Sequence, residues 1–311
     1  MTKLVSIIVV TFDNRTSLLK NCLASIFDSS YKNYEVIVVD NASDDNTRKM
    51  VKERYENKVR FIRSGTNLMA GGGRNLGSAS AKGEYFLFID DDNIIDRNMI
   101  GELVKGMNLR VDVGMVGPLM FYLTKKNTIW WAGSAINLLS SHTTYVGIGE
   151  TERGQYNEVS EVGHIPNVFM IKKEVWNKVG GIDQKYIIHY EESDLAERIR
   201  RSGYKIYRIP STKTFHAVQP ESENKIRNYV GQNSEKTYYT ARNRILFMNK
   251  FASRLNFILF LLLFNNLFLF FYFVIFFKSK KLSLIKNYLR GYFDGIKYVF
   301  SAKLDKELRY I

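Results

Sequence analysis

The stretch Phe86–Asp96 reads FLFIDDDNIID and decides the fold class. Its leading apolar residues predict a buried strand, and Asp90, Asp91 and Asp92 follow without a spacer. Adjacent carboxylates repel one another, so three of them at the end of a hydrophobic strand are unfavourable unless a cation offsets their charge. We therefore interpret the run as a binding site for a divalent cation, in preference to a solvated acidic turn that caps a helix.

The spacing within this run predicts which carboxylates act together. Residues two apart on an extended strand point to the same side, so Asp90 and Asp92 are expected to approach one ion. Ligand sets made only of oxygen favour Mg²⁺ or Mn²⁺, and the phosphates of a substrate would fill the remaining positions. The predicted metal pair is therefore Asp90 and Asp92.

Strand-like and helix-like patterns alternate over the first hundred residues. Strands are expected at residues 4–10, 34–39, 59–62 and 85–89, and helices at 17–27, 45–55 and 74–81. Shorter strands are expected at 113–116, 168–171 and 206–209. This alternation indicates βαβ units and a mostly parallel sheet, in which ligands bind beyond the carboxyl ends of the strands. Polar residues follow the first two strands, at Thr11-Phe12-Asp13 and Asp40-Asn41, which favours a nucleotide or phosphate site there.

The segment Asn67–Gly77 reads NLMAGGGRNLG and predicts a second part of that site. Its glycines would let the backbone approach a phosphate, and the N-terminus of the helix that follows would point at it. A dinucleotide-binding fold places its glycine motif after the first strand. Here the glycines come after the third strand, which argues against an oxidoreductase.

A third acidic group, YEESDL, lies at Tyr190–Leu195. It contains Glu191, Glu192 and Asp194 at the expected start of a helix that ends before Gly203. Acids at a helix N-terminus are stabilised by the helix dipole, so capping is one explanation for them. The alternative is a general base, which requires a carboxylate within reach of an acceptor hydroxyl.

Composition narrows the range of function classes. The formal net charge is +14, which suits nucleic acid, an anionic membrane surface or phosphorylated ligands. The single cysteine, Cys22, cannot form an intrachain disulfide or a cysteine metal cluster and is expected in the core. No signal peptide pattern is found at the N-terminus.

The C-terminal part of the chain favours the membrane over nucleic acid. No charged residue occurs between Arg254 and Lys278, and as a helix this segment would be roughly 35 Å long, enough to cross a bilayer. Basic residues flank both ends, so the orientation is not determined, and Asn265-Asn266 leaves a re-entrant hairpin open as well. The tail at 283–300 shows helical apolar spacing with basic residues between, as expected of a helix lying on an anionic leaflet.

Taken together, the motifs resemble the family 2 glycosyltransferases of the GT-A fold, and in particular the rhamnosyltransferase-like group that builds lipid-linked glycans. The resemblance covers about residues 4 to 250. It rests on VSIIVVTFDNR, VVDNASDD, NLMAGGGRNLG, FLFIDDDN, GGIDQKYIIHYEESDLAERIRRSGYKI, RIPSTKTFH and YYTARNRI, in that order. It implies an α/β fold with a Rossmann-like mixed sheet and an inverting transfer from a nucleoside-diphosphate sugar. The QxxRW motif of processive members is not found, which favours transfer of a single sugar.

The resemblance also implies site residues. Near the nucleobase and ribose it places Thr11, Phe12, Asp13 and Asp40, and near the ribose and diphosphate Asn67, Gly71, Arg74 and Asn75. His216 would join Asp90 and Asp92 as a metal or diphosphate contact, and Asp91 would contact the donor sugar or the neighbouring backbone. The family's catalytic base belongs to a Glu-Asp pair that here reads Glu191-Glu192. Glu192 is therefore the expected base, with Asp194 as the second choice.

These expectations define a domain plan and a set of partners. A catalytic domain is expected at 1–220, connector helices at 221–250, and a membrane-associated segment with a basic amphipathic tail at 251–311. The expected partners are a nucleoside-diphosphate sugar, a lipid-linked or other glycan acceptor and the cell membrane, with the catalytic domain on the cytoplasmic side. No nucleic acid partner is expected, and a homo-oligomer is left open. Two other functions compete: a sugar-phosphate nucleotidyltransferase and a non-catalytic membrane scaffold.

Overall fold

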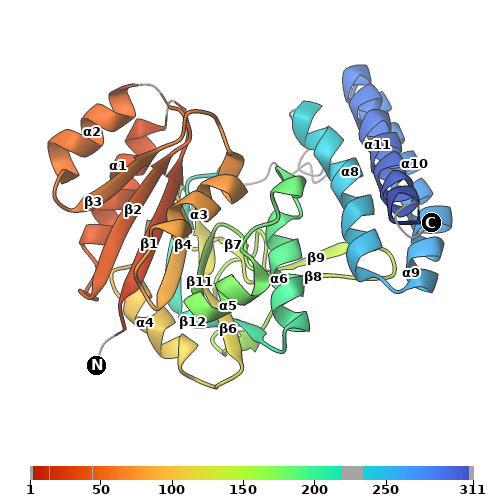
Figure 1. Cartoon of the computed structure of the whole chain (residues 1–311). Coiled ribbons are helices and arrows are strands. Elements are labelled where there is room, and N and C mark those ends of the chain that lie inside the picture. Colours follow the sequence, from red (N-terminus) through yellow and green to blue (C-terminus); the bar gives the residue numbers. More distant parts are fainter. Residues whose placement is uncertain (1–2, 14, 44, 219–233, 308–311) are drawn as a thin grey trace. The chain divides into compact units, whose positions relative to one another are not determined.

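The computed structural model describes residues 3–13, 15–43, 45–218 and 234–307 (Figure 1). The chain divides into two compact units, which are described separately below. The first unit comprises Met1–Ala135, Tyr145–Ile187 and Glu192–Pro220, and the second comprises Ile136–Thr144, Ile188–Glu191 and Glu221–Ile311. Residues 221–233 of the expected connector lie outside the described residues.

The first unit is built on one large mixed sheet (Figure 1). Its strands are β1 (Val5–Thr11), β2 (Tyr34–Asp40), β3 (Val59–Arg63), β4 (Tyr85–Asp90), β5 (Asn93–Ile95), β6 (Val113–Tyr122), β7 (Ile129–Trp131), β10 (Ser160–Glu161), β11 (Val168–Lys172) and β12 (Lys205–His216). The order is β10-β12-β6-β11-β4-β1-β2-β3, with β5 paired to β12 and β7 to β6. Strands β8 (Gly133–Ile136) and β9 (Thr143–Val146) form a separate pair.

The large sheet is parallel over β4, β1, β2 and β3 and mixed beyond β4, where β12 runs parallel to β6. Strand β1 runs parallel to β2 and β4, and β2 runs parallel to β3. Strand β11 is antiparallel to both β4 and β6. Every residue of β1 is buried, because parallel strands of this kind are covered by helices on both faces. The expected α/β fold with a mixed sheet is confirmed.

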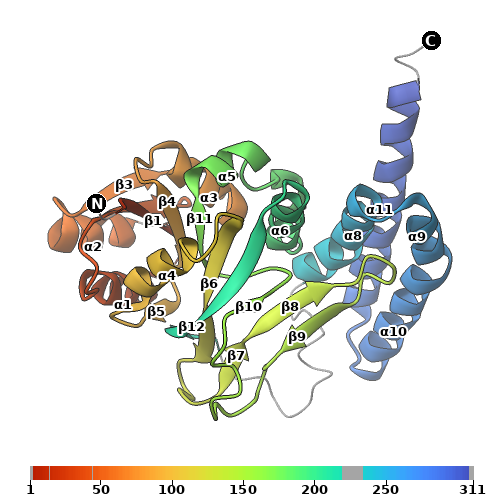
Figure 2. The ribbon, with the colours of Figure 1, turned by 90° about the horizontal axis from the view of Figure 1, so that it is seen from below.

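Helices cover both faces of this sheet. They are α1 (Thr16–Phe27), α2 (Asp45–Tyr55), α3 (Met69–Ala79), α4 (Met99–Met107), α5 (Lys173–Val179) and α6 (Glu191–Arg201), with a 3₁₀ turn at Gln184–Tyr186. Figure 2 shows α1 and α4 on one side of the sheet and α3 and α5 on the other. Cys22 of α1 is completely buried, as expected of a small core residue.

The glycine run lies inside a helix, not before it. Helix α3 begins at Met69, so the prediction of a glycine loop followed by a helix from residue 74 is wrong. A Cβ atom at Gly73 would lie 2.6 Å from the Val10 side chain, and one at Gly77 would lie 2.5 Å from the Ile8 side chain. The glycines therefore allow α3 to pack closely against β1.

The aspartate run is also arranged differently from the expectation. Strand β4 ends at Asp90, and Asp91 and Asp92 form the turn before β5. The alternation of side chains along a strand does not extend into this turn. The argument that Asp90 and Asp92 share one side of a strand is therefore wrong, and their placement follows from their contacts.

The second unit is helical (Figure 1). Its helices are α8 (Ser234–Phe251), α9 (Arg254–Leu259), α10 (Asn265–Lys278) and α11 (Leu282–Glu307), with a π-helical turn at Phe260–Phe264 between α9 and α10. Residues Arg254–Lys278 form one continuous helix, the one helix in the described part of the chain that is long and apolar enough to cross a membrane. A hairpin turn at Asn265-Asn266, one of two alternatives left open by the sequence, is therefore wrong.

Candidate active site

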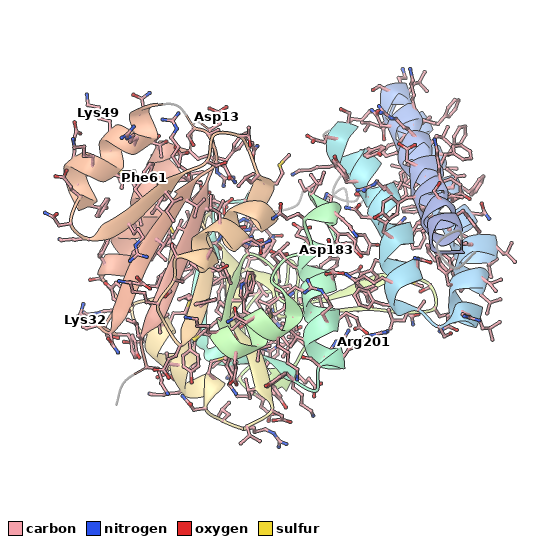
Figure 3. The ribbon with its side chains drawn as sticks, viewed as in Figure 1. Asp13, Lys32, Lys49, Phe61, Asp183 and Arg201 are labelled. Carbon is pink, nitrogen blue, oxygen red and sulfur yellow. The ribbon has the colours of Figure 1, made fainter. Side chains whose placement is uncertain are left out.

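Three parallel strands bring polar side chains to one edge of the sheet. Thr11 ends β1 opposite Asp40, the last residue of β2, and Val10 lies opposite Asp90, the last residue of β4. Figure 3 shows Asp13 at the same edge, beyond the carboxyl end of β1. This is the edge at which parallel α/β sheets bind their ligands.

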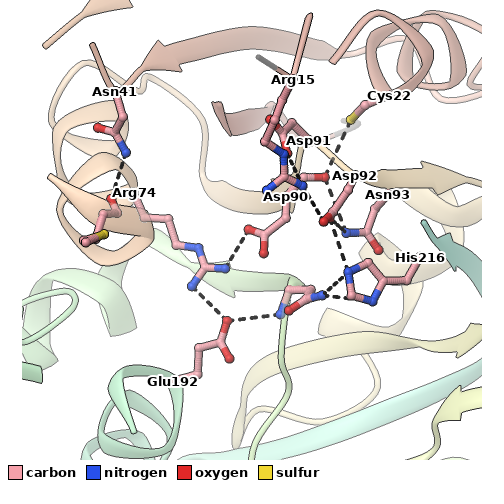
Figure 4. Close-up of polar contacts among 12 residues, drawn as sticks. Arg15, Cys22, Asn41, Arg74, Asp90, Asp91, Asp92, Asn93, Glu192 and His216 are labelled. Carbon is pink, nitrogen blue, oxygen red and sulfur yellow. Dashed lines mark hydrogen bonds and ion pairs between the residues drawn. The ribbon is translucent and has the colours of Figure 1, made fainter. Parts of the chain in front are cut away.

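Asp91 is held inside the protein beneath this edge (Figure 4). Its Oδ2 accepts a hydrogen bond from Thr11 Oγ1 at 2.7 Å, and Arg15 lies 2.9 Å from its Oδ1. Burial raises the pKa of Asp91 to about 7, although Arg15 and Thr11 favour the charged form. The side chain of Asp91 thus joins the turn at residues 91 and 92 to the end of β1.

Asp92 lies beside the last residue of β12. Its Oδ1 is 3.4 Å from His216 Nε2 and accepts a hydrogen bond from Asn93 at 3.0 Å, and its Oδ2 pairs with Arg15. Burial by itself would raise the pKa of Asp92, but His216 and Arg15 outweigh it and lower the pKa to about 2. Trp130 packs edge-on against the imidazole, with 4.4 Å between the ring centroids.

Glu192, at the start of α6, shares a buried arginine with Asp90. Arg74 donates to Glu192 Oε1 at 2.9 Å and to Asp90 Oδ1 at 2.8 Å (Figure 4). The backbone N–H of Asn167 donates to the same oxygen of Glu192 at 3.1 Å. Burial raises the pKa of Glu192, and the positive charge of Arg74 opposes this effect. Glu192 is thus close to Asp90 in space, although the two are distant in sequence.

Two residues of this network, Arg15 and Asn167, were not among the expected site residues. Arg15 was noted only as part of TFDNR, and Asn167 was not singled out. Asn167 has a left-handed backbone with φ of 56°, and its amide nitrogen lies 3.1 Å from His216 Nε2. Asparagine tolerates this conformation better than most residues, so the Pro166-Asn167 pair before β11 was the available signal.

The family is decided by comparison with known sequences. A profile described as "Glycosyl transferase family 2" matches residues 6–180, more than half of the chain. The chain belongs to this family. The resemblance inferred from the motifs is therefore confirmed at the level of the family. Glu192 and His216 lie beyond the matched residues, so their roles rest on geometry.

Curated relatives in the family are distant. The chain is 26% identical to "Glycosyltransferase GlyG" of Streptococcus pneumoniae over 58% of this chain, and the match spans 60% of GlyG. It is 26% identical to an uncharacterised glycosyltransferase of Haemophilus influenzae, covering 77% of this chain and 80% of that protein. It is 23% identical to the N-acetylglucosaminyl-diphospho-decaprenol L-rhamnosyltransferase of Mycobacterium tuberculosis, covering 78% and 86%.

Solved structures of glycosyltransferases show the same fold. GalNAc-T7, solved with UDP, GalNAc and Mn²⁺, matches with a TM-score of 0.59 and 18% identity, covering 78% of this chain and 51% of that one. Residues 1–349 of Staphylococcus aureus TarS, solved with UDP-GlcNAc, match with a TM-score of 0.57 and 18% identity, covering 81% and 68%. The expected GT-A fold is confirmed.

Several of the expected site residues make contacts that stabilise the fold. The Asn75 side chain donates to the Ile182 carbonyl at 2.8 Å and accepts from its N–H at 2.9 Å. A Cβ atom at Gly71 would lie 2.6 Å from the Ile182 side chain. Asn67 accepts a hydrogen bond from the Met69 N–H, at the start of α3. These contacts position the helix and the segment around Ile182, and we do not assign the two asparagines a ligand.

The acids near Glu192 differ in exposure. Asp194 is 0% exposed, and its carboxylate is bound by Arg198 at 2.7 Å. Its complete burial and its ion pair with Arg198 within α6 favour Glu192 over Asp194, the second-choice base. Glu191 is the first residue of α6, and Asp40 is buried with its Oδ1 accepting from the Ser43 N–H at 2.9 Å. Phe12 and Asp13 are exposed.

The residues present fit a divalent cation in part. No three metal-ligating side chains converge anywhere in the described residues. Asp92 and His216 offer a carboxylate oxygen and an imidazole nitrogen 3.4 Å apart, and oxygen and nitrogen donors of this kind suit Mn²⁺. The remaining ligands would come from a bound diphosphate and water, as is usual for Mg²⁺ and Mn²⁺ at phosphate sites.

Proposed function

We propose that the chain is an inverting glycosyltransferase that moves one sugar from a nucleoside-diphosphate sugar to a hydroxyl of a glycan acceptor. The observation that carries the proposal is the Glu192 carboxylate beside the aspartates at the strand ends. One of its oxygens is bound by Arg74 and by the Asn167 N–H. Such an arrangement supplies an oriented base next to the place where a charged donor would bind.

Glu192 is suited to remove a proton from the acceptor. Its Oε1 carries both hydrogen bonds, and its Oε2 receives none from the residues that the structure describes. The acceptor hydroxyl would give its proton to Oε2 while it attacks the anomeric carbon from the face opposite the diphosphate. Because the hydroxyl attacks directly, the anomeric configuration inverts and no covalent enzyme intermediate forms. A base with a raised pKa, as burial produces here, is closer to the operating pH.

Asp92 and His216 would hold the divalent cation together with the donor diphosphate, with Asp90 as the third expected contact. A cation held by these residues would neutralise the charge that develops on the leaving diphosphate. The presence of Mn²⁺ in the GalNAc-T7 structure supports this assignment. His216 and Arg15 keep the Asp92 carboxylate ionised, which a metal ligand requires.

For the nucleotide we propose a binding region, and for the acceptor a chemical class. We place the nucleoside beside Thr11, Phe12, Asp13 and Asp40, beyond the ends of β1 and β2. The relative from Mycobacterium tuberculosis is named for a decaprenol-linked substrate, which supports a lipid-linked acceptor here. We therefore propose that residues 1–220 carry catalysis on the cytoplasmic side of the cell membrane and that residues 251–311 associate with the membrane.

A donor screen tests the proposal. Release of nucleoside diphosphate is measured for a panel of nucleotide sugars with membranes as acceptor, in Mn²⁺ and in EDTA. We expect acceptor-dependent release with at least one donor and a loss of about 10²-fold or more for Glu192→Gln. The matched control is Glu174→Gln, an exposed glutamate on α5 that should leave turnover unchanged. Near-normal turnover of Glu192→Gln would show that the base lies elsewhere.

The same screen separates the competing functions. A nucleotidyltransferase would form a nucleotide sugar from a sugar phosphate and a nucleoside triphosphate, with release of pyrophosphate. A scaffold would turn over no donor. Full activity in EDTA, combined with full activity of Asp92→Ala, would remove the metal from the mechanism.

A further inference from the structure

The second unit presents a continuous apolar surface. Along the helix Arg254–Lys278, large apolar side chains are exposed at intervals of three or four residues. We call these residues the apolar stripe: Leu255, Ile258, Leu259, Leu262, Leu263, Leu267, Phe270, Phe271, Phe273 and Phe277. Leu262 is 72% and Phe270 67% exposed. A soluble protein rarely exposes so many neighbouring apolar side chains, so we expect the stripe to be covered by a binding partner.

The opposite side of the same helix packs inside the unit. Tyr272 stacks on Tyr288 of α11 with 4.5 Å between the ring centroids, and Phe276 is completely buried. Tyr292 donates a hydrogen bond to Asn266 Oδ1 at 2.9 Å. As the residue number rises along α11, its partner's number falls along α10, so the two helices run antiparallel. However Arg254–Lys278 lies in a membrane, α11 therefore lies beside it.

The polar group of Asn266 is satisfied within the unit. Its amide nitrogen donates to the carbonyls of Leu261 and Leu262 at 3.1 and 3.0 Å, and its oxygen accepts from Tyr292. No hydrogen bond from water is needed to stabilise this side chain. Asn266, an exposed polar residue beside the apolar stripe, is therefore compatible with burial in lipid.

The charges of α11 argue against a spanning arrangement. Lys286, Arg290, Asp294 and Lys297 are spaced three or four residues apart, and each has an exposed or partly exposed side chain. They lie on α11 on both sides of Tyr288 and Tyr292, the residues that contact α10. If Arg254–Lys278 crossed the bilayer, these charges would be distributed through its depth, where each is costly unless paired. Among the residues that the structure describes, one ion pair joins two of these four, Arg290 and Asp294, at 3.8 Å.

We propose that the second unit lies in the plane of the membrane surface and does not span it. The apolar stripe enters the acyl region of one leaflet, and the charges of α11 stay at the level of the headgroups. Basic residues at both ends of the stripe, Arg254, Lys278, Lys280 and Lys281, favour anionic phospholipids. The inference deepens the membrane association in the proposed function, but it does not depend on the transfer activity.

Vesicle flotation tests the partner. The full chain is floated with vesicles of phosphatidylcholine alone and with added phosphatidylglycerol. We expect stronger binding to the anionic vesicles, and a loss of about tenfold or more when Leu262→Glu and Phe270→Glu are combined. The control is Val111→Glu, which adds a carboxylate at a 93% exposed apolar residue of the first unit and should leave binding unchanged. The proposal would be overturned if the parent chain did not bind vesicles. If the parent chain were then an oligomer and the Leu262→Glu/Phe270→Glu variant a monomer, the partner of the apolar stripe would be a second copy of the chain.

Depth measurements test the in-plane arrangement. Nitroxide labels are attached to cysteines introduced at Leu255, Leu262, Phe270 and Phe277, one protein at a time, in vesicle-bound chains. Cys22 is fully buried, so the parent chain supplies the labelling background. Collision rates with oxygen and with a water-soluble nickel chelate give the depth of each label. If the helix lies in the plane of the membrane, all four labels should have similar, shallow depths. Labels at Leu262 and Phe270 that are much deeper than those at Leu255 and Phe277 would show that the helix crosses or penetrates the bilayer.

Discussion

Arg74 donates a hydrogen bond to Glu192 at 2.9 Å, from a side chain that is only 1% exposed. The same guanidinium binds Asp90 and lies over the Phe169 ring at 5.4 Å from its centroid. Arginine is the one side chain that can present parallel donors to two carboxylates while remaining charged in such a site. Arg74 therefore fixes the distance between the proposed base and the end of β4, and it acts as a positioning residue.

Arg74→Lys should slow the reaction while preserving the charge. The ammonium group of lysine cannot bridge both carboxylates in the same geometry, so Glu192 loses its fixed orientation. We expect kcat to fall by about 10- to 100-fold, with a smaller change in KM for the donor. Arg97→Lys, at an exposed position, is the matched control. Unchanged kcat in Arg74→Lys would show that the bridge has no role in positioning.

The rate should depend on pH through Glu192. A general base acts in its deprotonated form, and burial raises the pKa of Glu192 above the ordinary 4.5. As pH falls, kcat/KM should therefore begin to decrease at a higher pH than an ordinary glutamate would cause. The profile is measured with saturating Mn²⁺ and compared with the residual activity of Glu192→Gln, which should lack this limb. A profile that stays flat down to the ordinary glutamate range would contradict the assignment.

Asn243 should stabilise the backbone that precedes the base. Its side-chain nitrogen donates to the carbonyls of Ile188 and His189 at 2.8 and 3.0 Å, within the second unit. His189 and Tyr190 have positive φ values of 64° and 70°, which non-glycine residues adopt at a cost of about 1 kcal/mol or more each. Asn243→Leu leaves both carbonyls without this donor.

We expect Asn243→Leu to lower the free energy of unfolding of the second unit by about 2–4 kcal/mol. The 187–191 segment should also become more susceptible to proteolysis, and kcat should fall because Glu192 follows this segment directly. Asn287→Leu is the control, because the amide of Asn287 donates to the Ser283 carbonyl on an exposed surface. Equal resistance to protease in the two variants would disprove the role of Asn243.

The parallel strands β1–β4 were predictable, and the full length of β12 was not. Strands β1 and β4 are buried on both faces, so they appear in the sequence as unbroken apolar runs. Strand β12 was expected only at 206–209 but extends over Lys205–His216. Its apolar pattern breaks at Pro210-Ser211, where the pairing register with β6 shifts between Ile209 and Lys213. The sequence of β12 alone does not predict that pairing with β6 continues the strand beyond this irregularity.

The site was predictable as a set of residues but not as a network. The aspartate run was identifiable because three carboxylates directly after an apolar strand are unusual, and Glu192 was identifiable through the resemblance to the family. Arg74 was expected to face the diphosphate, whereas it is buried between Asp90, 16 residues away, and Glu192, 118 residues away. The pairing of such distant charges is decided by the packing of α3 and α6 against the sheet, which spacing alone does not encode.

Helices α8 and α11 should be sensitive to any side chain at Gly291. A methyl group there would overlap the Tyr238 carbonyl oxygen, and one at Gly295 would lie 3.0 Å from the Ile245 side chain. Small residues four apart allow helices to pack closely. We expect Gly291→Ala to destabilise the second unit by about 2–4 kcal/mol, measured by the loss of helical circular dichroism on heating.

Gly101→Ala provides a control of opposite sign. Gly101 lies in α4, and a Cβ atom there would make an ordinary 3.7 Å contact with Tyr31. Alanine favours the helix over glycine, so this variant should be neutral or stabilised by up to about 1 kcal/mol. Similar melting of Gly291→Ala and the parent chain would show that α8 and α11 do not pack closely at this residue.

His164 should make the first unit sensitive to acid. Burial lowers the pKa of His164 from 6.5 to about 4, and the charge of Arg200 contributes in the same direction. Between these two values the unfolded chain binds a proton that the folded chain does not. The folded state therefore loses stability as pH falls from 6.5 towards 4, by up to about 3 kcal/mol in total, and this effect is constant below that range.

His164→Gln should remove this part of the pH dependence. The free energy of unfolding is measured by urea titration at several pH values, with tryptophan fluorescence as the signal, because Trp130, Trp131 and Trp176 all lie in the first unit. The variant should lose less stability than the parent between pH 6.5 and 4. His142→Gln, at an exposed residue, should follow the parent. If His164→Gln and the parent lose stability in parallel over this range, the acid sensitivity arises from other groups.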